Sequence, residues 1–319
     1  MLLIDSHVDT PTELVRHGRD LGADNPGVHV DFPKMKRGGV GGAFFALYTP
    51  ADMAPDTATR LALEMIAATY DSLQAHADSA ALALSPQDAA RNRAQGRLSV
   101  FLGMENGAPI QESLPLLRTF YRLGVRYLTL THNGDNAIAD SAAEGKRWNG
   151  LSPFGREVVR EMNALGMMVD LSHASDKTFW DCLEVSTAPI VATHSCCRAL
   201  CGHRRNLTDD MLRALGEKDG YVGINFYPAF LSDHYEQHLP GVREIVDHID
   251  HAVELAGVDH VGIGTDYDGI EITPEGMEDI SKVGLVWEEM RRRGYTEGEI
   301  EQVSGGNLLN VLQRITINK

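Results

Sequence analysis

Short apolar runs that each end at a histidine or a carboxylate constrain the fold of this chain more than any other sequence feature. Residues 2–4 precede His7 and Asp9, and residues 98–102 precede Glu105. In α/β barrel enzymes the reacting groups lie at the carboxyl ends of the strands. We therefore expect side chains from six strand ends to meet at one mouth of a barrel. They are His7, Asp9, Glu105, His132, His173, His194 and Asp266.

Strand and helix patterns alternate along the chain. Each expected strand is short, rich in Val, Ile, Leu or Phe, and bounded by Gly, Pro or Asn. Eight such units predict an α/β fold, a (β/α)8 or TIM barrel, as a single domain over residues 1–319. The segments 17–39 and 133–153 are expected to be loops over the carboxyl-terminal face. Strands are expected at 1–5, 40–47, 98–104, 126–131, 167–171, 189–193, 220–226 and 260–264, and helices at 56–77, 113–123, 153–165, 175–185, 208–217, 241–256 and 297–315.

Composition excludes several classes of function. The 319 residues carry a formal net charge of −16, which disfavours binding to nucleic acid or to an anionic membrane surface. No uncharged apolar run is long enough for a membrane helix, and a candidate ligand at position 7 leaves no room for a signal peptide. The spacing of Cys196, Cys197 and Cys201 lacks the paired pattern of zinc sites. These thiols and Cys182 are therefore expected to be free, in the cytoplasm.

Histidines and carboxylates at neighbouring strand ends indicate a metal centre. Residues two apart on a strand share one face, so His7 and Asp9 can reach one ion together. Glu105 can bridge to a second ion that His173 and His194 bind. Neutral imidazoles with carboxylates suit Zn²⁺, although Mn²⁺ or Co²⁺ could use the same ligands. We expect two zinc ions bridged by Glu105 and a hydroxide, which would serve as a nucleophile at neutral pH.

Three further features supply the remaining parts of a hydrolase site. Asp266 is expected to move the proton, with Asp268 as a competitor farther from the strand. His132 would stabilise the oxyanion of a tetrahedral intermediate. The sequence Arg204-Arg205-Asn206 is either a solvated basic turn or a guanidinium fork for a substrate carboxylate.

Several motifs together make the chain resemble the membrane dipeptidase (renal dipeptidase) family of zinc peptidases, within the amidohydrolase-like barrels. The resemblance covers nearly the whole chain, and the motifs follow the order of the family. They are Ile4-Asp-Ser-His7-Val-Asp9, Gly103-Met-Glu105-Asn-Gly, Leu128-Thr-Leu-Thr-His132-Asn, Asn149-Gly-Leu-Ser-Pro-Phe-Gly155, Val169-Asp-Leu-Ser-His173, Thr193-His194-Ser, Arg204-Arg205-Asn206 and Gly264-Thr-Asp266-Tyr-Asp268-Gly269.

The resemblance implies a role for each motif. It assigns the metal ligands as above and places His132 against the scissile carbonyl oxygen. It places Arg205 at the C-terminal carboxylate of the substrate, Asp266 at the general acid/base, and Tyr227 near the substrate pocket. The implied reaction is hydrolysis of small dipeptides, L-L and also L-D. The family often forms dimers, so a homodimer is an open expectation. The chain is similar to a soluble bacterial member, so we expect no lipid anchor of the mammalian kind.

Two other readings stay open at this point. Another amidohydrolase activity, above all an N-acyl-(D-)amino acid hydrolase, would also use Arg205 for a carboxylate. A deaminase-type site usually has one metal and needs no bridging carboxylate, so Glu105 disfavours it. A non-catalytic binding barrel would be expected to lose a ligand or the proton carrier, and this sequence retains them all.

Overall fold

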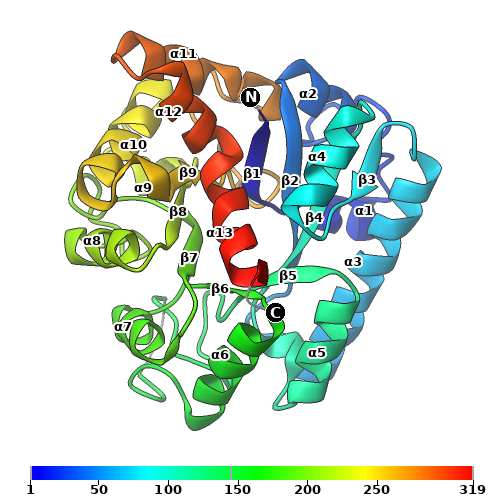
Figure 1. Ribbon diagram of the computed structural model, residues 1–319, viewed down its shortest axis with the longest axis vertical. Coiled ribbons are helices and arrows are strands. Elements are labelled where there is room, and N and C mark those ends of the chain that lie inside the picture. Colours follow the sequence, from blue (N-terminus) through cyan, green and yellow to red (C-terminus); the bar gives the residue numbers. More distant parts are fainter. Residues whose placement is uncertain (1, 144–145, 318–319) are drawn as a thin grey trace.

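The computed structural model describes residues 2–143 and 146–317, and its centre is a parallel barrel (Figure 1). Eight strands pair in chain order, and no antiparallel pairing occurs among these strands in the described residues. Between the last strand and the first, the Asp9 amide donates to Tyr267 O at 2.8 Å and the Asp266 amide donates to His7 O at 3.0 Å. The predicted (β/α)8 barrel is confirmed. Its strands are β1 (Leu3–Val8), β2 (Val40–Tyr48), β4 (Leu98–Glu105), β5 (Val125–Thr129), β6 (Met168–Asp170), β7 (Ile190–Ser195), β8 (Tyr221–Ile224) and β9 (Val261–Ile263).

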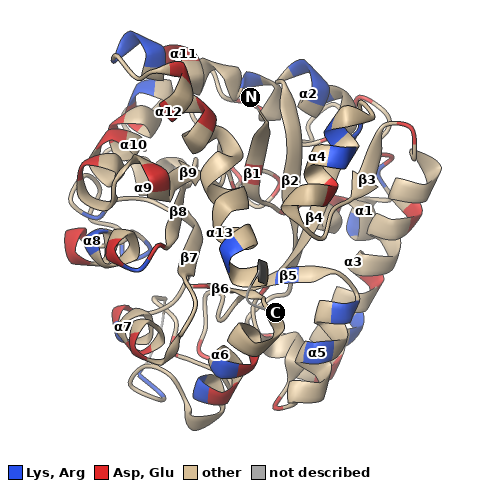
Figure 2. Cartoon of the chain, in the orientation of Figure 1, with Lys and Arg blue, Asp and Glu red and all other residues tan. Residues whose placement is uncertain are grey.

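Helices form a ring outside the strands, and most charged residues lie on the helices and loops (Figure 2). Ser152, Ser175 and Thr208 accept hydrogen bonds from backbone amides at the starts of three of them, as N-caps do. The helices that the sequence predicts are α3 (Pro55–Ala75), α5 (Leu114–Arg122), α6 (Pro153–Leu165), α7 (Asp176–Val185), α8 (Asp209–Glu217) and α10 (Val242–Ala256).

The prediction of one continuous helix over residues 297–315 is wrong. The structure has α12 (Glu297–Glu301), a π-helical turn (Gln302–Gly306) and α13 (Asn307–Ile317). At Gly305 the backbone passes so close to β1 that a Cβ would lie 2.6 Å from Leu2 O and 2.7 Å from Ile4 N. This close approach needs glycine and interrupts the regular helix.

The prediction of a simple loop over residues 17–39 is wrong, because this segment contains α2 (Phe32–Arg37). Asp31 caps this helix by accepting from the Lys34 amide at 2.8 Å. Short elements of this kind carry a weak periodic signal, which is why other ones also escape prediction. They are α1 (Thr10–His17), α4 (Pro86–Ala94), α9 (Pro228–Leu231), α11 (Gly284–Arg292) and β3 (Ala80–Leu82), which pairs with β4.

The two mouths of the barrel differ. Residues early in the strands form an apolar cluster with Leu308, Val311 and Leu312 of α13, which crosses the centre of the ring (Figure 1). The amino-terminal mouth is therefore filled by side chains. Its strand residues are Ile4, Phe44, Phe101, Tyr127, Met168, Val191 and Tyr221. Polar chemistry is left to the opposite, carboxyl-terminal mouth.

Candidate active site

The side chains predicted from the strand ends come together at the carboxyl-terminal mouth. Asp9, Glu105, His132, His173 and Asp266 line one cavity of about 440 Å³. His7 and His194 are fully buried beside them, with ring centroids 3.8 Å apart. Asp9 reaches the cluster from the N-cap of α1, one residue beyond β1, and not from a shared strand face as the sequence argument assumed.

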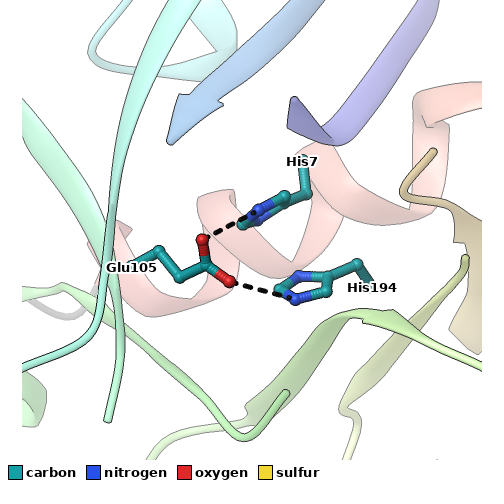
Figure 3. A group of neighbouring side chains, drawn as sticks. All are labelled: His7, Glu105 and His194. Carbon is teal, nitrogen blue, oxygen red and sulfur yellow. Dashed lines mark ion pairs between the residues drawn. The ribbon is translucent and has the colours of Figure 1, made fainter. Parts of the chain in front are cut away.

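Glu105, the last residue of β4, lies at the centre of the cluster (Figure 3). Its Oε2 is 3.7 Å from His7 Nε2. Its Oε1 is 3.0 Å from His173 Nε2 and 3.5 Å from His194 Nε2. The two carboxylate oxygens thus face different histidines, which is the arrangement a bridging ligand needs.

Each of these three histidines has its other ring nitrogen engaged. His7 Nδ1 lies 2.7 Å from the Tyr127 hydroxyl, and His194 Nδ1 lies 2.9 Å from Thr193 Oγ1. His173 Nδ1 lies 2.9 Å from Asn133 Oδ1. The Nε2 atoms are therefore the ones directed at Glu105. Metal-binding histidines are commonly oriented in this way by partners of their second nitrogen.

Several buried polar atoms of the cluster have no hydrogen-bond partner among the described residues. They include Nε2 of His7, Nε2 of His194 and Oδ1 of Asp9. Uncompensated buried polar atoms are costly, and buried charged groups are commonly paired, hydrogen-bonded or bound to a metal. The donor atoms also lie close enough to hold an ion in three overlapping groups. These are His7, Glu105 and His194; Glu105, His132 and His173; and His7, Asp9 and Asp266.

The grouping differs in detail from the ligand sets expected from the sequence. His194 was expected to share an ion with His173, yet its ring lies nearer to His7. His132 was expected to contact only substrate, but its donor atom also lies within reach of Glu105 and His173. Because all these groups share a small volume, geometry alone permits more than one assignment.

Burial and mutual charge shift the pKa values of the cluster strongly. Burial alone would lower the pKa of His7, but Glu105 and Asp9 outweigh it and raise this pKa well above its usual value. Burial raises the pKa of Asp9 well above normal, and the Glu105 charge adds to the shift. Burial opposes ionisation of Glu105, yet His7 and hydrogen bonds from His173 and His194 hold its pKa well below normal. Glu105 and Asp9 thus stabilise positive charge on the His7 ring.

Asp266 and Asp268 have different environments. Asp266 Oδ1 lies 3.7 Å from His7 Nε2, while Asn225 Nδ2 donates to Asp266 Oδ2 at 2.9 Å. Asp268 instead accepts from Thr10 Oγ1 at 2.8 Å and from the His29 amide at 2.7 Å. Burial raises the pKa of Asp268 to about 7. Asp266 is thus the carboxylate directed at the cluster, and Asp268 joins α1 to the loop that precedes α2.

The amide of Asn225 has a defined orientation. Its Oδ1 accepts a hydrogen bond from the Tyr227 backbone amide at 2.6 Å, so its NH₂ group must face Asp266. Asp266 itself has a φ of 64°, in the left-handed region. A Cβ on Gly269 would lie 2.2 Å from Asp9 Oδ2 and 2.9 Å from Asp266 Oδ1. The lack of a side chain at Gly269 gives these two carboxylates their space.

Arg205 faces a second cavity of about 320 Å³ next to the first. Its side chain is buried, with Nη2 donating to His194 O at 3.2 Å and its guanidinium 5.3 Å from the Phe230 ring. Arg205 Nε has no hydrogen-bond partner, and no described carboxylate lies within 4.0 Å of the guanidinium. Among the described residues, the charges of Asp266, Glu105 and Asp170 act on this buried cation from a longer range.

The neighbours of Arg205 behave differently. Arg204 is exposed and donates to Ala143 O at 2.8 Å. Asn206 is buried and donates to Cys201 O and Phe230 O, so it anchors the loop. Of the basic motif, Arg205 is the residue that combines burial with a place in the cavity wall.

The expected pocket residue Tyr227 lies in the wall shared by both cavities, beside Phe230 at a ring separation of 5.1 Å. Sequence reasoning missed Tyr48, the last residue of β2. The ring of Tyr48 lies 4.8 Å from the ring of His132. It also missed Tyr127 and Asn225, which contact His7 and Asp266. Each lies in or directly after a predicted strand, but no sequence pattern separates such residues from ordinary core positions.

Two expectations about the wider chain can also be compared with the structure. Cys182, Cys196, Cys197 and Cys201 are all buried free thiols, as predicted. Among the described residues, no helix is both long enough and apolar enough to cross a membrane.

Sequence comparison gives the family context of this site. Residues 1–319 match the family model of the membrane dipeptidases, peptidase family M19. The chain is also 45% identical over 219 residues to an uncharacterized dipeptidase of Schizosaccharomyces pombe. That match covers 68% of this chain and 53% of the yeast protein, so the chain spans about half the length of this curated relative.

Solved structures agree over the whole fold. The probable dipeptidase PvdM from Pseudomonas aeruginosa is 26% identical, with a TM-score of 0.94 and coverage of 100% of this chain and 96% of that one. A metallopeptidase from Rhodobacter sphaeroides, liganded with a phosphinate mimic of L-Ala-D-Ala, is 29% identical, with a TM-score of 0.93 and 99% coverage of both chains. An amidohydrolase from Pseudomonas aeruginosa, 23% identical with a TM-score of 0.83, shares the fold over 98% of this chain and 96% of its own. The amidohydrolase-like barrel is thereby confirmed.

Proposed function

This chain belongs to the membrane dipeptidase family, peptidase family M19, and we propose from that premise that it is a zinc-dependent dipeptidase. The proposed substrates are free dipeptides, both L-L and L-D. The relative from Rhodobacter sphaeroides was solved with a mimic of L-Ala-D-Ala, which supports including an L-D substrate. The observation that carries the proposal is the buried cluster around Glu105 next to the unpaired buried cation of Arg205.

The side chains present fit two zinc ions. Their donors are imidazole nitrogens and carboxylate oxygens, and several of these buried atoms have no hydrogen-bond partner among the described residues. His7 and Asp9 would hold one ion, His173 and His194 the other, and Glu105 would bridge them. When bound, the metal ions would supply Lewis acidity and lower the pKa of a water molecule so that it attacks at neutral pH.

Asp266 is proposed as the general base and acid. Its Oδ2 is held by Asn225, which leaves Oδ1 on the side of the cluster. Oδ1 would take the proton from the attacking water and return it to the leaving amine. The fixed orientation of Asn225 would keep Asp266 aimed through both transfers.

His132 is proposed to donate a hydrogen bond to the oxyanion that develops on the scissile carbonyl. Burial lowers its pKa, which keeps the ring neutral, and its position in the cavity wall exposes it to substrate. A positioned donor of this kind contributes about 3–4 kcal/mol to transition-state stabilisation in other hydrolases.

Recognition of both ends of a dipeptide is supported by the charges of the two cavities. Arg205 would pair with the C-terminal carboxylate, and Tyr227 and Phe230 would flank it. Glu271 lies in the wall of the larger cavity and is assigned neither to a metal ion nor to proton transfer, so it would pair with a free ammonium group at the other end. An N-acylated amino acid lacks that ammonium group.

Hydrolysis of a matched panel by the zinc-loaded protein tests the proposal. The panel contains L-Ala-L-Ala, L-Ala-D-Ala, the same peptides amidated at the C-terminus, and N-acetyl-alanine of either configuration. Cleavage of the free dipeptides with loss on amidation is expected. Cleavage of only the N-acetyl compounds would replace the proposal with an N-acyl amino acid hydrolase, and cleavage of none would overturn it.

Two further expectations belong to the same proposal. The four buried free thiols are typical of a protein kept in a reducing compartment, so we propose a cytoplasmic location. A homodimer remains a prediction, which light scattering of the purified protein would test.

A further inference from the structure

Tyr127 lies directly beneath the metal-binding cluster, inside the barrel. Its ring is fully buried and packs 5.3 Å from that of Phe44. On the neighbouring strand, a Cβ at Gly103 would lie 2.0 Å from the Tyr127 ζ carbon. The ring occupies the space that Gly103 leaves, and this fixes where its hydroxyl points.

The Tyr127 hydroxyl contacts one partner, His7 Nδ1, at 2.7 Å, and has no other hydrogen-bond partner among the described residues. A neutral imidazole carries its proton on only one nitrogen. For His7 Nε2 to offer a lone pair to a cation, the proton must lie on Nδ1, and the phenolic oxygen is placed to accept it. The contact therefore fixes the ring orientation and is compatible with the tautomer that metal binding requires.

Among the described residues, His7 Nε2 faces three carboxylates, whereas His173 and His194 each pair with Glu105 alone. The Nε2 atom of His7 lies 3.4 Å from Asp9 Oδ2, 3.7 Å from Glu105 Oε2 and 3.7 Å from Asp266 Oδ1. If the His7 ring were flipped about its Cβ–Cγ bond, a carbon atom would face all three carboxylates in place of Nε2. The ring orientation of His7 thus determines whether these carboxylates and an imidazole nitrogen converge on one point.

We infer that Tyr127 is a positioning residue for the metal centre, acting through His7. The inference rests on the proposed function, because it assumes that His7 binds a metal ion. Tyr127 does not line the cavity in which the substrate would bind, and no described contact joins it to Glu105. Its substitution should therefore affect metal binding before it affects substrate recognition.

The barrel offers a matched control in Tyr221. This residue is also a buried interior tyrosine, on β8, and it too packs over a glycine of the next strand, since a Cβ at Gly262 would lie 2.3 Å from its hydroxyl. Its hydroxyl donates to Ile263 O at 3.3 Å and does not contact His7. Tyr221→Phe therefore removes the same atom from a comparable environment.

The test measures zinc affinity of metal-free parent, Tyr127→Phe and Tyr221→Phe by competition with a chromophoric chelator. Loss of a partner of a metal-binding histidine typically weakens metal affinity about 10–100-fold. In Tyr127→Phe, the affinity for one of the two zinc equivalents should therefore fall by that factor. Tyr221→Phe should stay within about 3-fold of the parent on the same scale. The visible spectrum of the Co²⁺-loaded protein should change in Tyr127→Phe alone.

Thermal unfolding of the metal-free proteins separates positioning from packing. Both variants should unfold at similar temperatures, because each loses one buried hydroxyl. Parent-like zinc affinity in a folded Tyr127→Phe, or equal weakening in both variants, would overturn the inference while leaving the proposed metal centre in place. A parent protein that binds no zinc would overturn the metal centre, and this inference with it.

Discussion

The two neighbouring cavities are built differently, and they form an anionic half and a cationic half of the site. One half is anionic and lies on the ends of barrel strands, where Glu105 and its histidines are held by the sheet. The other half is cationic and lies on the loop after β7, where Arg205 is buried against Phe230. The net charge of −16 would not suggest a buried cation. Strand ends thus hold the anionic cluster that we propose as the metal centre, while a loop holds the buried cation that we propose for substrate recognition.

The largest effect is expected from the centre of the anionic half. Glu105→Gln keeps the shape but removes the charge shared by both sides of the cluster. Loss of metal-based stabilisation worth several kcal/mol should lower kcat/KM by on the order of 10⁴-fold. Zinc content, measured by elemental analysis after dialysis, should fall in parallel. Full zinc content with intact turnover would break the assignment of the bridge.

Asp266→Asn should have the next largest effect. General acid–base catalysis contributes about 10²–10⁴-fold, so kcat should fall by on the order of 10³-fold while zinc content stays at the parent level. Asp268→Asn is the matched control, since Asp268 is bonded to Thr10 and His29. If Asp266→Asn lost zinc and Asp268→Asn lost turnover, the two roles would be reversed.

Acid should destabilise the cationic half through His248. Burial lowers the pKa of His248 to about 4, and its Nδ1 accepts from the Cys197 amide at 3.0 Å, on the loop leading to Arg205. Between the unfolded pKa of about 6.5 and pH 4, the unfolded chain binds a proton that the folded chain does not. Stability should therefore fall with decreasing pH through this window, by about 2 kcal/mol near pH 4.5.

Urea unfolding of the parent and of His248→Gln at pH 7 and pH 4.5 would measure this contribution. The loss between the two pH values should be smaller in the variant by about 2 kcal/mol, because the titrating group is gone. An equal loss in both proteins would show that other groups account for the acid sensitivity.

The smallest effect concerns the guanidinium itself. A charge-assisted hydrogen bond is worth about 1.5–3 kcal/mol, so Arg205→Ala should lower kcat/KM for free dipeptides by about 10–100-fold, mainly through KM. Amidated dipeptides, which lack the carboxylate, should be affected far less. Arg204→Gln is the control, because Arg204 is exposed, and it should stay within about 3-fold. Equal losses in the two variants would mean a general electrostatic effect.

The contrast between strand ends and loops also explains which site residues could be predicted from the sequence. The strand-end residues were predictable because a short apolar run followed by His7 or Glu105 places the side chain at a known mouth of a known fold. Residue patterns alone did not separate Arg205 from Arg204, since only the loop path buries one and exposes the other, and it was the family resemblance that pointed to Arg205. The role of Asn225 depends on the Tyr227 amide that fixes its orientation, which no spacing encodes.

The fold shows the same division. All eight barrel strands were predictable from apolar runs, whereas the break at Gly305 follows from a close approach to β1, three hundred residues away in the chain. The pairing of Tyr127 with Gly103 is equally a product of register between neighbouring strands. Contacts between distant segments thus account for what the sequence patterns leave out.

Titration of the metal-free protein with zinc, followed by hydrolysis of L-Ala-D-Ala, tests the central claim most directly. We predict no hydrolysis without metal, a rise as zinc is added, and a plateau at two equivalents per chain. Full hydrolysis by the metal-free protein, or none at two bound equivalents, would contradict the proposed two-metal dipeptidase.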